Sequence, residues 1–354
     1  MSLKSLIATG TKVWLDGVEP GEIKKNRAWG VTGATSNPTI VSKIIESGYF
    51  DGRIHDLLLG EGSTNEEIAW ELDDELVKGA QQVFLPVWAG TRGNDGYVSF
   101  ELDPLIEDSA TGLSHESRVK RYVQLGKKWA AGHKNRMIKV PATDAGLEAL
   151  EPLAAAGVTI NVTLMFTVRQ YRIAREAIWK GALRRQNGLG DFKSVYSVFV
   201  SRVDSYTEQH LPTLSQHAQG WVGIDNAKWI WRENEEFWRG KGLRLQQEIV
   251  FASTGVKKSG VPADKYVEAF AGAGIETNPS LTNEAVERSK KIYSRHIDQM
   301  PPQDIVNEID SKLNIAEMEH LLMEEGIAKF AQPQRAMLQY IANQRSEIVT
   351  CERV

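Results

Sequence analysis

The chain has 354 residues, of which 42% are hydrophobic and 25% are charged, and this composition is typical of globular proteins. The formal net charge of −4 argues against a nucleic acid or an anionic membrane surface as the main partner. The only cysteine is Cys351, which excludes a disulfide framework and a thiolate metal site, and no apolar run approaches the length of a membrane span. We therefore expect a soluble, cytoplasmic protein.

The first part of the chain predicts two short strands and a helical region. An apolar strand ends at Asp16, in an Asp-Gly pair that is first of all a turn signal. A second strand leads into a polar turn that contains Thr35 and Asn37, and Pro38 suits the first turn of the helix that follows. Residues 51–90 have the apolar spacing of helices.

Two later segments, 97–102 and 159–165, alternate strictly between apolar and polar residues, as strands with one packed face do. The apolar faces carry Val98, Phe100 and Leu102 in the first segment and Ile160, Val162 and Leu164 in the second. The opposite faces carry Glu101 in the first segment and Asn161 and Thr163 in the second. If helices cover the apolar faces, these polar residues point into a barrel. The alternative is a half-exposed antiparallel strand with Glu101 in solvent.

Between these segments, Lys139 lies inside an apolar strand that leads to a turn and to a helix starting near Gly146. Removing an ammonium group from water costs several kcal/mol unless the group is paired or neutralised. The cost is explained if the neutral amine attacks a carbonyl group and forms a Schiff base. From this segment alone, a lysine that reaches solvent or pairs with a buried acid is an equal alternative.

Strands and helices continue to alternate along the rest of the chain. The further predicted helices cover 114–134, 146–156, 168–186 and 203–239, and the further strands cover 194–200, 248–253 and 274–279. Residues 280–350 are mostly helical, and breaks at Pro301 and Pro333 divide them into three helices. About eight strand–helix alternations predict an α/β fold, a (β/α)8 TIM barrel. We expect one domain over residues 1–354, with 280–354 as a C-terminal helical extension.

Polar side chains recur where the predicted strands end, which is where barrel enzymes place their chemistry. The set comprises Asp16, Asn37, Glu101, Lys139, Asn161, Thr163, Ser197, Arg202 and Ser253. One such residue means little, but a set on the same side of every strand indicates an active site. Schiff-base chemistry needs a desolvated amine and an acid that can act as a base, and Lys139, Glu101 and Asp16 supply them.

Several of these segments resemble those of the transaldolase family. Residues 33–41 (GATSNPTIV) and 137–147 (MIKVPATDAGL) are similar to its two signatures, the second of which carries the Schiff-base lysine. The segments 98–103, 161–166, 197–202 and 252–257 resemble its third, fifth, sixth and seventh strand segments, in that order. The resemblance covers about residues 10–280 and points to the longer bacterial branch of the family.

The resemblance implies a role for each matched residue. Lys139 would attack the ketose carbonyl, while Glu101 would shuttle protons through a water molecule held by Thr163. Asp16 would take and return the proton of the C4 hydroxyl group. The residues implied in substrate binding are Thr35, Asn37, Asn161, Ser197, Phe199, Arg202, Ser253 and Lys257. No metal and no cofactor is implied, because the protonated imine is itself the electron sink.

The implied reaction belongs to the non-oxidative pentose phosphate pathway. A dihydroxyacetone unit would pass from sedoheptulose 7-phosphate or fructose 6-phosphate to erythrose 4-phosphate or glyceraldehyde 3-phosphate. Gly255 departs from the family, because many members have an arginine there that helps to hold the phosphate. Arg202 is kept, and Lys257 or Lys258 would supply a second cation without the fork geometry of arginine. A solvated turn is the alternative for these two lysines.

Other functions remain alternatives at this level. A Schiff-base aldolase that releases free dihydroxyacetone would use the same lysine. A sugar-phosphate-binding barrel without catalysis predicts the loss of Lys139, Glu101 or Asp16, and all three are present. No dinucleotide-binding or P-loop pattern lies at a strand–helix junction. The oligomeric state stays open, and a homodimer through the C-terminal helices or the Trp-rich segment 203–239 is compatible with the sequence.

Overall fold

A closed barrel of eight parallel strands forms the centre of this computed structural model, which describes residues 2–60, 62–258 and 260–351. Each strand pairs with the next one in the chain, and β8 pairs with β1. The strands are β1 Lys12–Asp16, β2 Gly33–Thr35, β3 Val98–Glu101, β4 Arg136–Pro141, β5 Ile160–Met165, β6 Ser194–Phe199, β7 Glu248–Ala252 and β8 Ile275–Asn278. The predicted (β/α)8 barrel is confirmed. Ser259, in the predicted loop 255–260, lies outside the described residues.

Helices surround the barrel and continue beyond its last strand. Those between strands are α2 Pro20–Ala28, α3 Pro38–Glu46, α4 Asp51–Leu59, α5 Asn65–Gly90, α6 His115–Ala130, α7 Asp144–Ala155, α8 Val168–Leu183, α9 Ser201–His210, α10 Val222–Trp238 and α11 Lys265–Phe270. The others are α1 Ser2–Ala8, α12 Ser280–Ser289, α13 Gln303–Lys312 and α14 Ile315–Cys351, with the 3-10 helices η1 Pro104–Glu107 and η2 Ser109–Thr111. The regions predicted over 51–90 and 203–239 each form two helices.

Two helix starts differ from the prediction because side chains cap them. Helix α2 was not predicted, yet it begins at Pro20, and the Glu19 carboxylate accepts hydrogen bonds from the first backbone N–H groups. A proline at the first position after a capping side chain is a favourable start. Helix α7 begins at Asp144 and not near Gly146, because the Thr143 hydroxyl accepts a hydrogen bond from the backbone N–H of Gly146 (3.1 Å).

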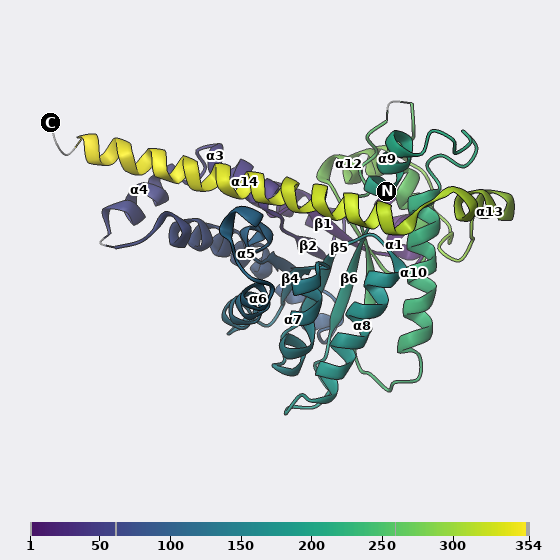
Figure 1. Cartoon of the computed structure of the whole chain (residues 1–354), viewed down its shortest axis with the longest axis horizontal. Coiled ribbons are helices and arrows are strands. Elements are labelled where there is room, and N and C mark those ends of the chain that lie inside the picture. The colour runs from purple at the N-terminus through teal and green to yellow at the C-terminus, as the bar shows by residue number, and fades with distance from the viewer. Residues whose placement is uncertain (1, 61, 259, 352–354) are drawn as a thin grey trace.

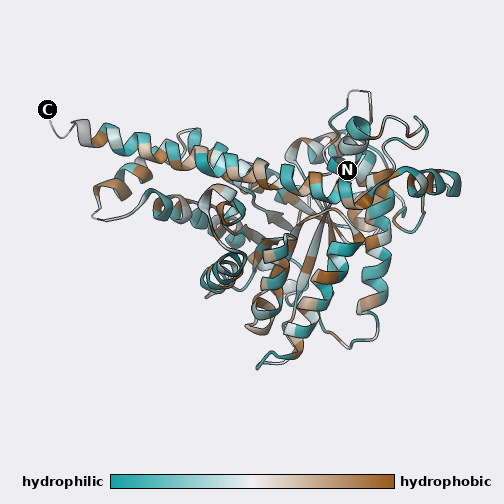
Figure 2. Cartoon of the chain, viewed as in Figure 1, coloured by the Kyte–Doolittle hydropathy of each residue, from teal (hydrophilic) through white to brown (hydrophobic). Residues whose placement is uncertain are grey.

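The C-terminal helix α14 spans 37 residues and lies across helices α3, α4 and α5 (Figure 1). The predicted break at Pro333 is wrong. A proline removes one backbone hydrogen bond, and buried Phe330 and Met337 on either side of it hold the helix in place. Hydrophilic and hydrophobic residues are mixed along the length of α14 (Figure 2). Within the described ranges, no helix is long and apolar enough to cross a membrane.

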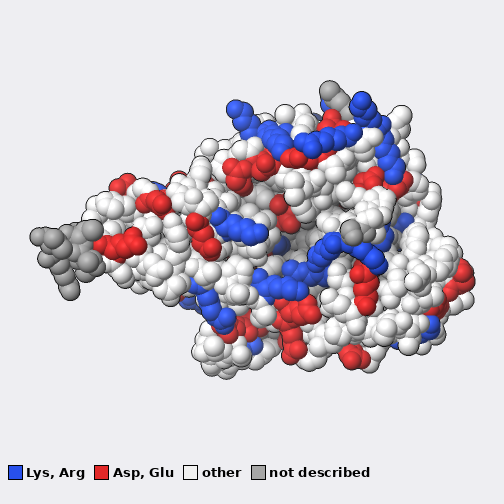
Figure 3. Space-filling model, turned by 90° about the horizontal axis from the view of Figure 1, so that it is seen from above, with Lys and Arg blue, Asp and Glu red and all other residues white. Residues whose placement is uncertain are grey.

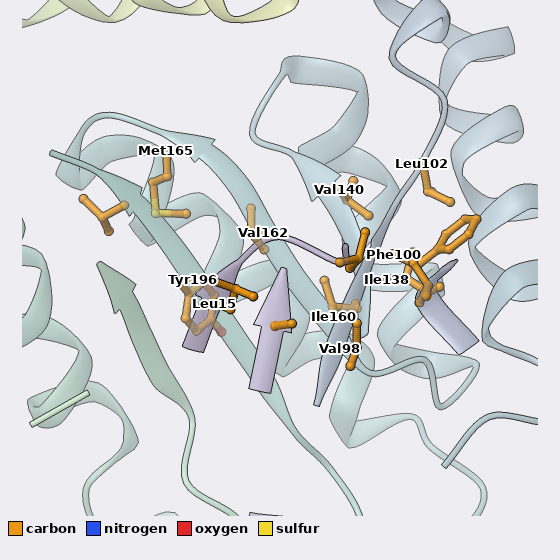
Figure 4. Packing of buried hydrophobic residues seen from close by; sticks show 14 of the residues in the cluster. Leu15, Val98, Phe100, Leu102, Ile138, Val140, Ile160, Val162, Met165 and Tyr196 are labelled. Atoms are coloured by element: carbon orange, nitrogen blue, oxygen red, sulfur yellow. The ribbon is translucent and has the colours of Figure 1, made fainter. Parts of the chain in front are cut away.

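Apolar side chains fill the space between the strands and the helices. Val98 and Phe100 of β3 and Ile138 and Val140 of β4 are fully buried in this layer (Figure 4). The guanidinium group of Arg136 lies 4.8 Å from the centre of the Phe100 ring. Burying each large apolar side chain contributes roughly 1.5–3 kcal/mol. The alternation predicted for 97–102 is thus confirmed, and it leaves Glu101 on the inner side of the barrel.

The barrel interior has an apolar layer and a polar layer. The apolar layer contains Trp14, Tyr97, Met137, Val195, Val250 and Ile275. The layer is tight at Gly33, where an added Cβ atom would stand 2.7 Å from the Trp14 ring and 2.7 Å from the Tyr97 carbonyl oxygen. The next inward positions along β1, β4 and β8 are Asp16, Lys139 and Thr277. The polar layer therefore lies above an apolar floor, towards the C-terminal ends of the strands.

Strand β5 departs from regular alternation beside this polar layer. Its pairing with β6 shifts register between Val162 and Met165, and Leu164 has a φ of 50°. A left-handed conformation costs a non-glycine residue roughly 1–2 kcal/mol. Met165 packs in the outer layer, whereas Leu164 packs with Phe199 in a second apolar cluster. The prediction that Leu164 shares the outer face with Val162 is therefore wrong.

Candidate active site

Strand register places Lys139 between two polar residues. Glu101 of β3 pairs with Lys139 of β4, and Lys139 pairs with Asn161 of β5. The Lys139 Nζ atom donates hydrogen bonds to Glu101 Oε2 (2.9 Å) and to the backbone carbonyl of Ser36 (3.0 Å). Lys139 is only 4% exposed. The sequence left open whether Lys139 pairs with a buried acid, and the structure shows that it does. The pairing places a carboxyl group, which can act as acid or base, in contact with the Lys139 amine.

Burial sets the protonation of Glu101. It raises the pKa of the Glu101 carboxyl group above its ordinary value of 4.5, although the Lys139 ammonium group opposes the shift. A carboxylate with a raised pKa accepts a proton more readily at neutral pH. Because the contact with Lys139 is direct, Glu101 is placed to exchange a proton with the amine without an intervening group.

Asp16 is held by two neighbours from β2 and the turn after it. Its Oδ1 atom accepts hydrogen bonds from the Thr35 hydroxyl (3.1 Å) and the Asn37 side-chain amide (3.3 Å). The Asn37 amide is oriented because its oxygen accepts the backbone N–H of Ile40 (3.0 Å) and caps α3. The Thr277 hydroxyl lies 2.9 Å from that of Thr35. Burial raises the pKa of Asp16 above 3.8, with Lys139 opposing.

Asn161 of β5 and Ser197 of β6 form a second buried polar group, on strands distant from β1, which carries Asp16. The Ser197 hydroxyl donates to Asn161 Oδ1 (2.7 Å), and the Asn161 amide donates to the Ser99 hydroxyl (2.9 Å). The neighbouring Thr163 hydroxyl is fully buried and has no hydrogen-bond partner among the described residues. Since such a group is costly to leave unpaired, Thr163 offers a place for a bound polar group.

A cation lies between aromatic rings at one side of the site. The guanidinium group of Arg202 is 5.0 Å from the centre of the Phe199 ring and 5.7 Å from that of the Phe330 ring. Its Nη1 atom is buried and makes no hydrogen bond within the part of the chain that the structure describes. Burial lowers the pKa of Lys257, and the charge of Arg202 adds to that effect. Lys258 instead forms an ion pair with Glu208 (3.0 Å).

These groups surround a cavity of about 90 Å³. It is lined by the predicted residues Asp16, Thr35, Asn37, Lys139, Ser197, Phe199, Arg202 and Ser253, and also by Ala252, Thr277 and Phe330. Glu101, Asn161 and Thr163 lie buried around it, and Lys257 does not line it. In the described ranges, no group of three or more His, Cys, Asp or Glu side chains is arranged to hold a metal ion.

Three lining residues were missed for different reasons. Thr277 follows Ile275 at a spacing of two in the predicted last strand, so alternation could have placed it inside the barrel. Ala252 has no polar group that would attract notice. Phe330 lies far along the chain in α14, and no local pattern shows that this helix reaches the barrel mouth.

A model of the Transaldolase/Fructose-6-phosphate aldolase family matches residues 13–341. The chain belongs to this family. A relative named Transaldolase from Thermobifida fusca is 29% identical, over 97% of this chain and 98% of the relative. Transaldolase 2 from Streptomyces avermitilis is 31% identical over 93% of each chain, and a Transaldolase from Arthrobacter sp. is 32% identical over 80% of each.

A second buried lysine–glutamate pair in this transaldolase/aldolase family member offers an internal comparison. Lys193, directly before β6, pairs with Glu248 at the start of β7, at the opposite end of the barrel. Burial lowers the pKa of Lys193, and it also raises that of Glu248, but Lys193 and Lys12 outweigh this second effect, so the pKa of Glu248 is lowered overall. Glu248 therefore stays ionised between two cations, whereas the raised pKa of Glu101 favours proton exchange. Lys139 lies at the C-terminal mouth of the barrel, where barrel enzymes place their chemistry, whereas Lys193 lies at the other end.

Proposed function

We propose that the protein is a transaldolase that moves a dihydroxyacetone unit between sugar phosphates through an imine on Lys139. The donors would be sedoheptulose 7-phosphate or fructose 6-phosphate, and the acceptors would be glyceraldehyde 3-phosphate or erythrose 4-phosphate. The observation that carries the proposal is the direct contact of the buried Lys139 amine with Glu101, in a cavity that also contains Asp16. Membership of the family and the names of the relatives support it.

In the first half of the reaction, Glu101 takes a proton from Lys139, and the neutral amine attacks the C2 carbonyl of the ketose. Glu101 then returns a proton to the resulting hydroxyl group, which leaves as water and gives the imine. The unpartnered Thr163 hydroxyl is available to hold that water. Asn161 and Ser197 are oriented by their mutual hydrogen bond to receive hydroxyl groups of the three-carbon unit.

In the second half, Asp16 takes the proton of the C4 hydroxyl group while the C3–C4 bond breaks. The bonding electron pair moves into the protonated imine to give an enamine, and the aldose phosphate leaves. The enamine carbon then attacks the aldehyde of the acceptor, whose oxygen takes the proton back from Asp16, and water hydrolyses the new imine to release the product ketose and the Lys139 amine. The hydrogen bonds from Thr35 and Asn37 hold the Asp16 carboxylate in place for both transfers.

Phosphate binding is proposed for Arg202, with Lys257 as a second cation. The Nη1 atom of Arg202 has no hydrogen-bond partner among the residues that the structure describes, and guanidinium groups suit phosphate oxygens. An added Cβ atom at Gly255 would meet only Pro279, at 3.5 Å, so the structure does not require glycine there. The surrounding face mixes basic and acidic side chains (Figure 3), so attraction of the phosphate has to come from these local cations.

The test is borohydride reduction in the presence of fructose 6-phosphate, followed by peptide mass mapping. We expect a three-carbon adduct on Lys139 and none on Lys193, which is the matched buried lysine. A coupled assay with erythrose 4-phosphate then measures transfer. A folded sample with no adduct on Lys139, or with equal labelling of Lys193, contradicts the proposal and leaves a sugar-phosphate-binding barrel.

The proposed function also predicts the cellular location of the protein, and domain organisation and oligomeric state are further proposals. Phosphorylated sugars carry charges that keep them from crossing membranes, so an enzyme that uses them is expected in the cytoplasm. We also propose that the barrel and the C-terminal helices form one domain, because α14 packs against α3 and α5, and that any homodimer forms through the C-terminal helices or the Trp-rich segment 203–239. Light scattering of the purified protein measures the oligomeric state, and a single cooperative unfolding transition is expected of one domain.

A further inference from the structure

Among the described residues that line the active-site cavity, Phe330 alone comes from α14, whereas the others belong to the barrel strands and the segments that follow them. Its ring centre lies 5.8 Å from the Lys139 Nζ atom, and the side chain is 6% exposed. Helix α14 passes across the helices at this end of the barrel (Figure 1). Phe330 therefore forms an apolar wall over the amine that the reaction uses.

The size of the cavity shows what this wall encloses. A volume of about 90 Å³ is well below the roughly 300–1,000 Å³ of typical small-molecule sites. Such a space suits a three-carbon unit attached to Lys139 and is too small for a whole phosphorylated sugar. The rest of the donor or acceptor must therefore extend beyond this space, past Phe330, which lines the cavity beside the amine.

Two residues near Phe330 weaken the backbone of α14 locally, so a shift of Phe330 need not displace the rest of the helix, which buried Met337 also anchors. Gly326 lies one turn before it, and Pro333 lies three residues after it inside the same helix. Glycine and proline both weaken a helix interior. The Arg202 guanidinium group lies over the rings of both Phe330 and Phe199. The phenylalanine side chain is uncharged, so its movement breaks no ion pair.

We propose that Phe330 sets the partition between transfer of the dihydroxyacetone unit and its release, by excluding water from the enamine. This inference rests on the proposed transaldolase function. The enamine has two fates. It attacks an acceptor aldehyde, or its carbon takes a proton and water then hydrolyses the imine, which frees Lys139 and dihydroxyacetone. Both routes end in hydrolysis of an imine, which regenerates the amine, and they differ at the enamine carbon: release needs a proton delivered to that carbon, and water that enters the cavity supplies it.

The test compares wild type with Phe330→Ala and Phe330→Leu. The readouts are the ratio of transfer to dihydroxyacetone release, and the incorporation of deuterium into released dihydroxyacetone in heavy water. We expect the ratio to fall on the order of tenfold for Phe330→Ala, because exclusion of water is lost. The smaller but still apolar leucine should give a fall in the same direction of lesser size, and it serves if the alanine variant does not fold.

Leu322→Ala is the matched control, because Leu322 is buried on α14 in the same apolar cluster and does not line the cavity. It should weaken the packing of α14 and leave the ratio unchanged. Borohydride trapping on Lys139 accompanies every measurement. Trapping with an unchanged ratio in both Phe330 variants overturns this inference alone, as does an equal fall in Leu322→Ala. Absence of trapping in wild type overturns the proposed function itself.

Discussion

At the scale of single residues, the surroundings of a charged group decide what it can do. Glu101 and Glu248 each pair with a buried lysine in the same barrel. Glu101 has one cation in contact and a raised pKa, whereas Glu248 contacts two cations and has a lowered pKa. The first arrangement suits proton exchange, and the second suits a fixed ion cluster.

The variant Glu101→Gln tests this role. Glutamine keeps the shape and cannot accept a proton, so we expect kcat to fall about 10²–10⁴-fold. Since the pKa values of Glu101 and Asp16 are raised, the wild-type rate should decline with falling pH at values above 4.5, where these bases become protonated. Steady-state kinetics over pH measure both. An unchanged kcat, or an acid limb near the ordinary values, contradicts the assignment.

Glu276 is a buried residue outside the active site whose protonation is also set by burial. The alternation with Ile275 and Thr277 places it on the outer face of β8, and its carboxyl oxygens make no hydrogen bond of good geometry within the described chain, with only a weak interaction from the Asn278 amide. Burial raises its pKa far above 4.5, and the Asn278 amide opposes this only in part. The folded protein therefore holds a proton that the unfolded chain has already released above pH 4.5.

The direction in which pH changes the stability follows from the higher pKa of Glu276 in the folded state. This contribution to stability is complete below pH 4.5 and is lost as pH rises towards the folded pKa, by at most about 1.4 kcal/mol per pH unit. Glu276→Gln removes the dependence, so its melting temperature should gain on that of wild type as pH rises above 4.5 towards the folded pKa of Glu276. A difference that is constant over this range would show that Glu276 is already ionised in the fold.

At the scale of elements, close packing under the site fixes the strands that carry it. Strand β2 has only three residues, and Gly33 lets it pass the Trp14 ring before it presents Thr35 to Asp16. In β5, the left-handed Leu164 directly follows Thr163 and turns its own side chain towards the cluster under α14. Local backbone choices therefore set the positions of hydroxyl groups in the site.

Gly33→Ala should destabilise the protein by roughly 1–3 kcal/mol, because the Tyr97 carbonyl leaves no room for a methyl group. A shifted β2 should also lower kcat through the loss of the Thr35–Asp16 contact. The control is Gly79→Ala in α5, where an added Cβ atom meets nothing within 4 Å. That variant should gain about 1 kcal/mol. Denaturant unfolding and kinetics compare the two, and equal effects refute the packing argument.

At the scale of the whole molecule, chemistry and stability occupy opposite ends of one barrel. The C-terminal ends of the strands hold the cavity under α14, and the N-terminal ends hold the cluster of Lys12, Lys193 and Glu248. An apolar layer separates the two ends. Changes at one end are therefore expected to leave the other largely unaffected.

Glu248→Gln tests this separation. It leaves two lysines without their acid, one of them fully buried, so the cost should be about 3–5 kcal/mol. Formation of the Lys139 adduct per folded molecule should be unchanged. Thermal unfolding and borohydride trapping measure the two effects. A loss of trapping in folded Glu248→Gln would show that the ends are coupled.

The sequence by itself determined the barrel and most residues around its mouth. The alternation of residues 97–102 predicted that Glu101 points into the barrel, and the apolar strand around Lys139 marked this lysine as unusual. The polar turn before Pro38 predicted the position of Asn37 at the start of a helix. These features are local, since the two-residue period of a strand and the preferences of turns act over a few positions.

Only the tertiary structure decided the direct contact of Lys139 with Glu101, the break in alternation at Leu164, and the arrival of Phe330 over the cavity. The first depends on the register between two strands and the second on pairing with β6. The third depends on where a continuous α14 packs, and the prediction of a break at Pro333 failed because long-range burial outweighed a local preference. Interactions between distant segments have no signature in the short windows from which a single sequence is interpreted.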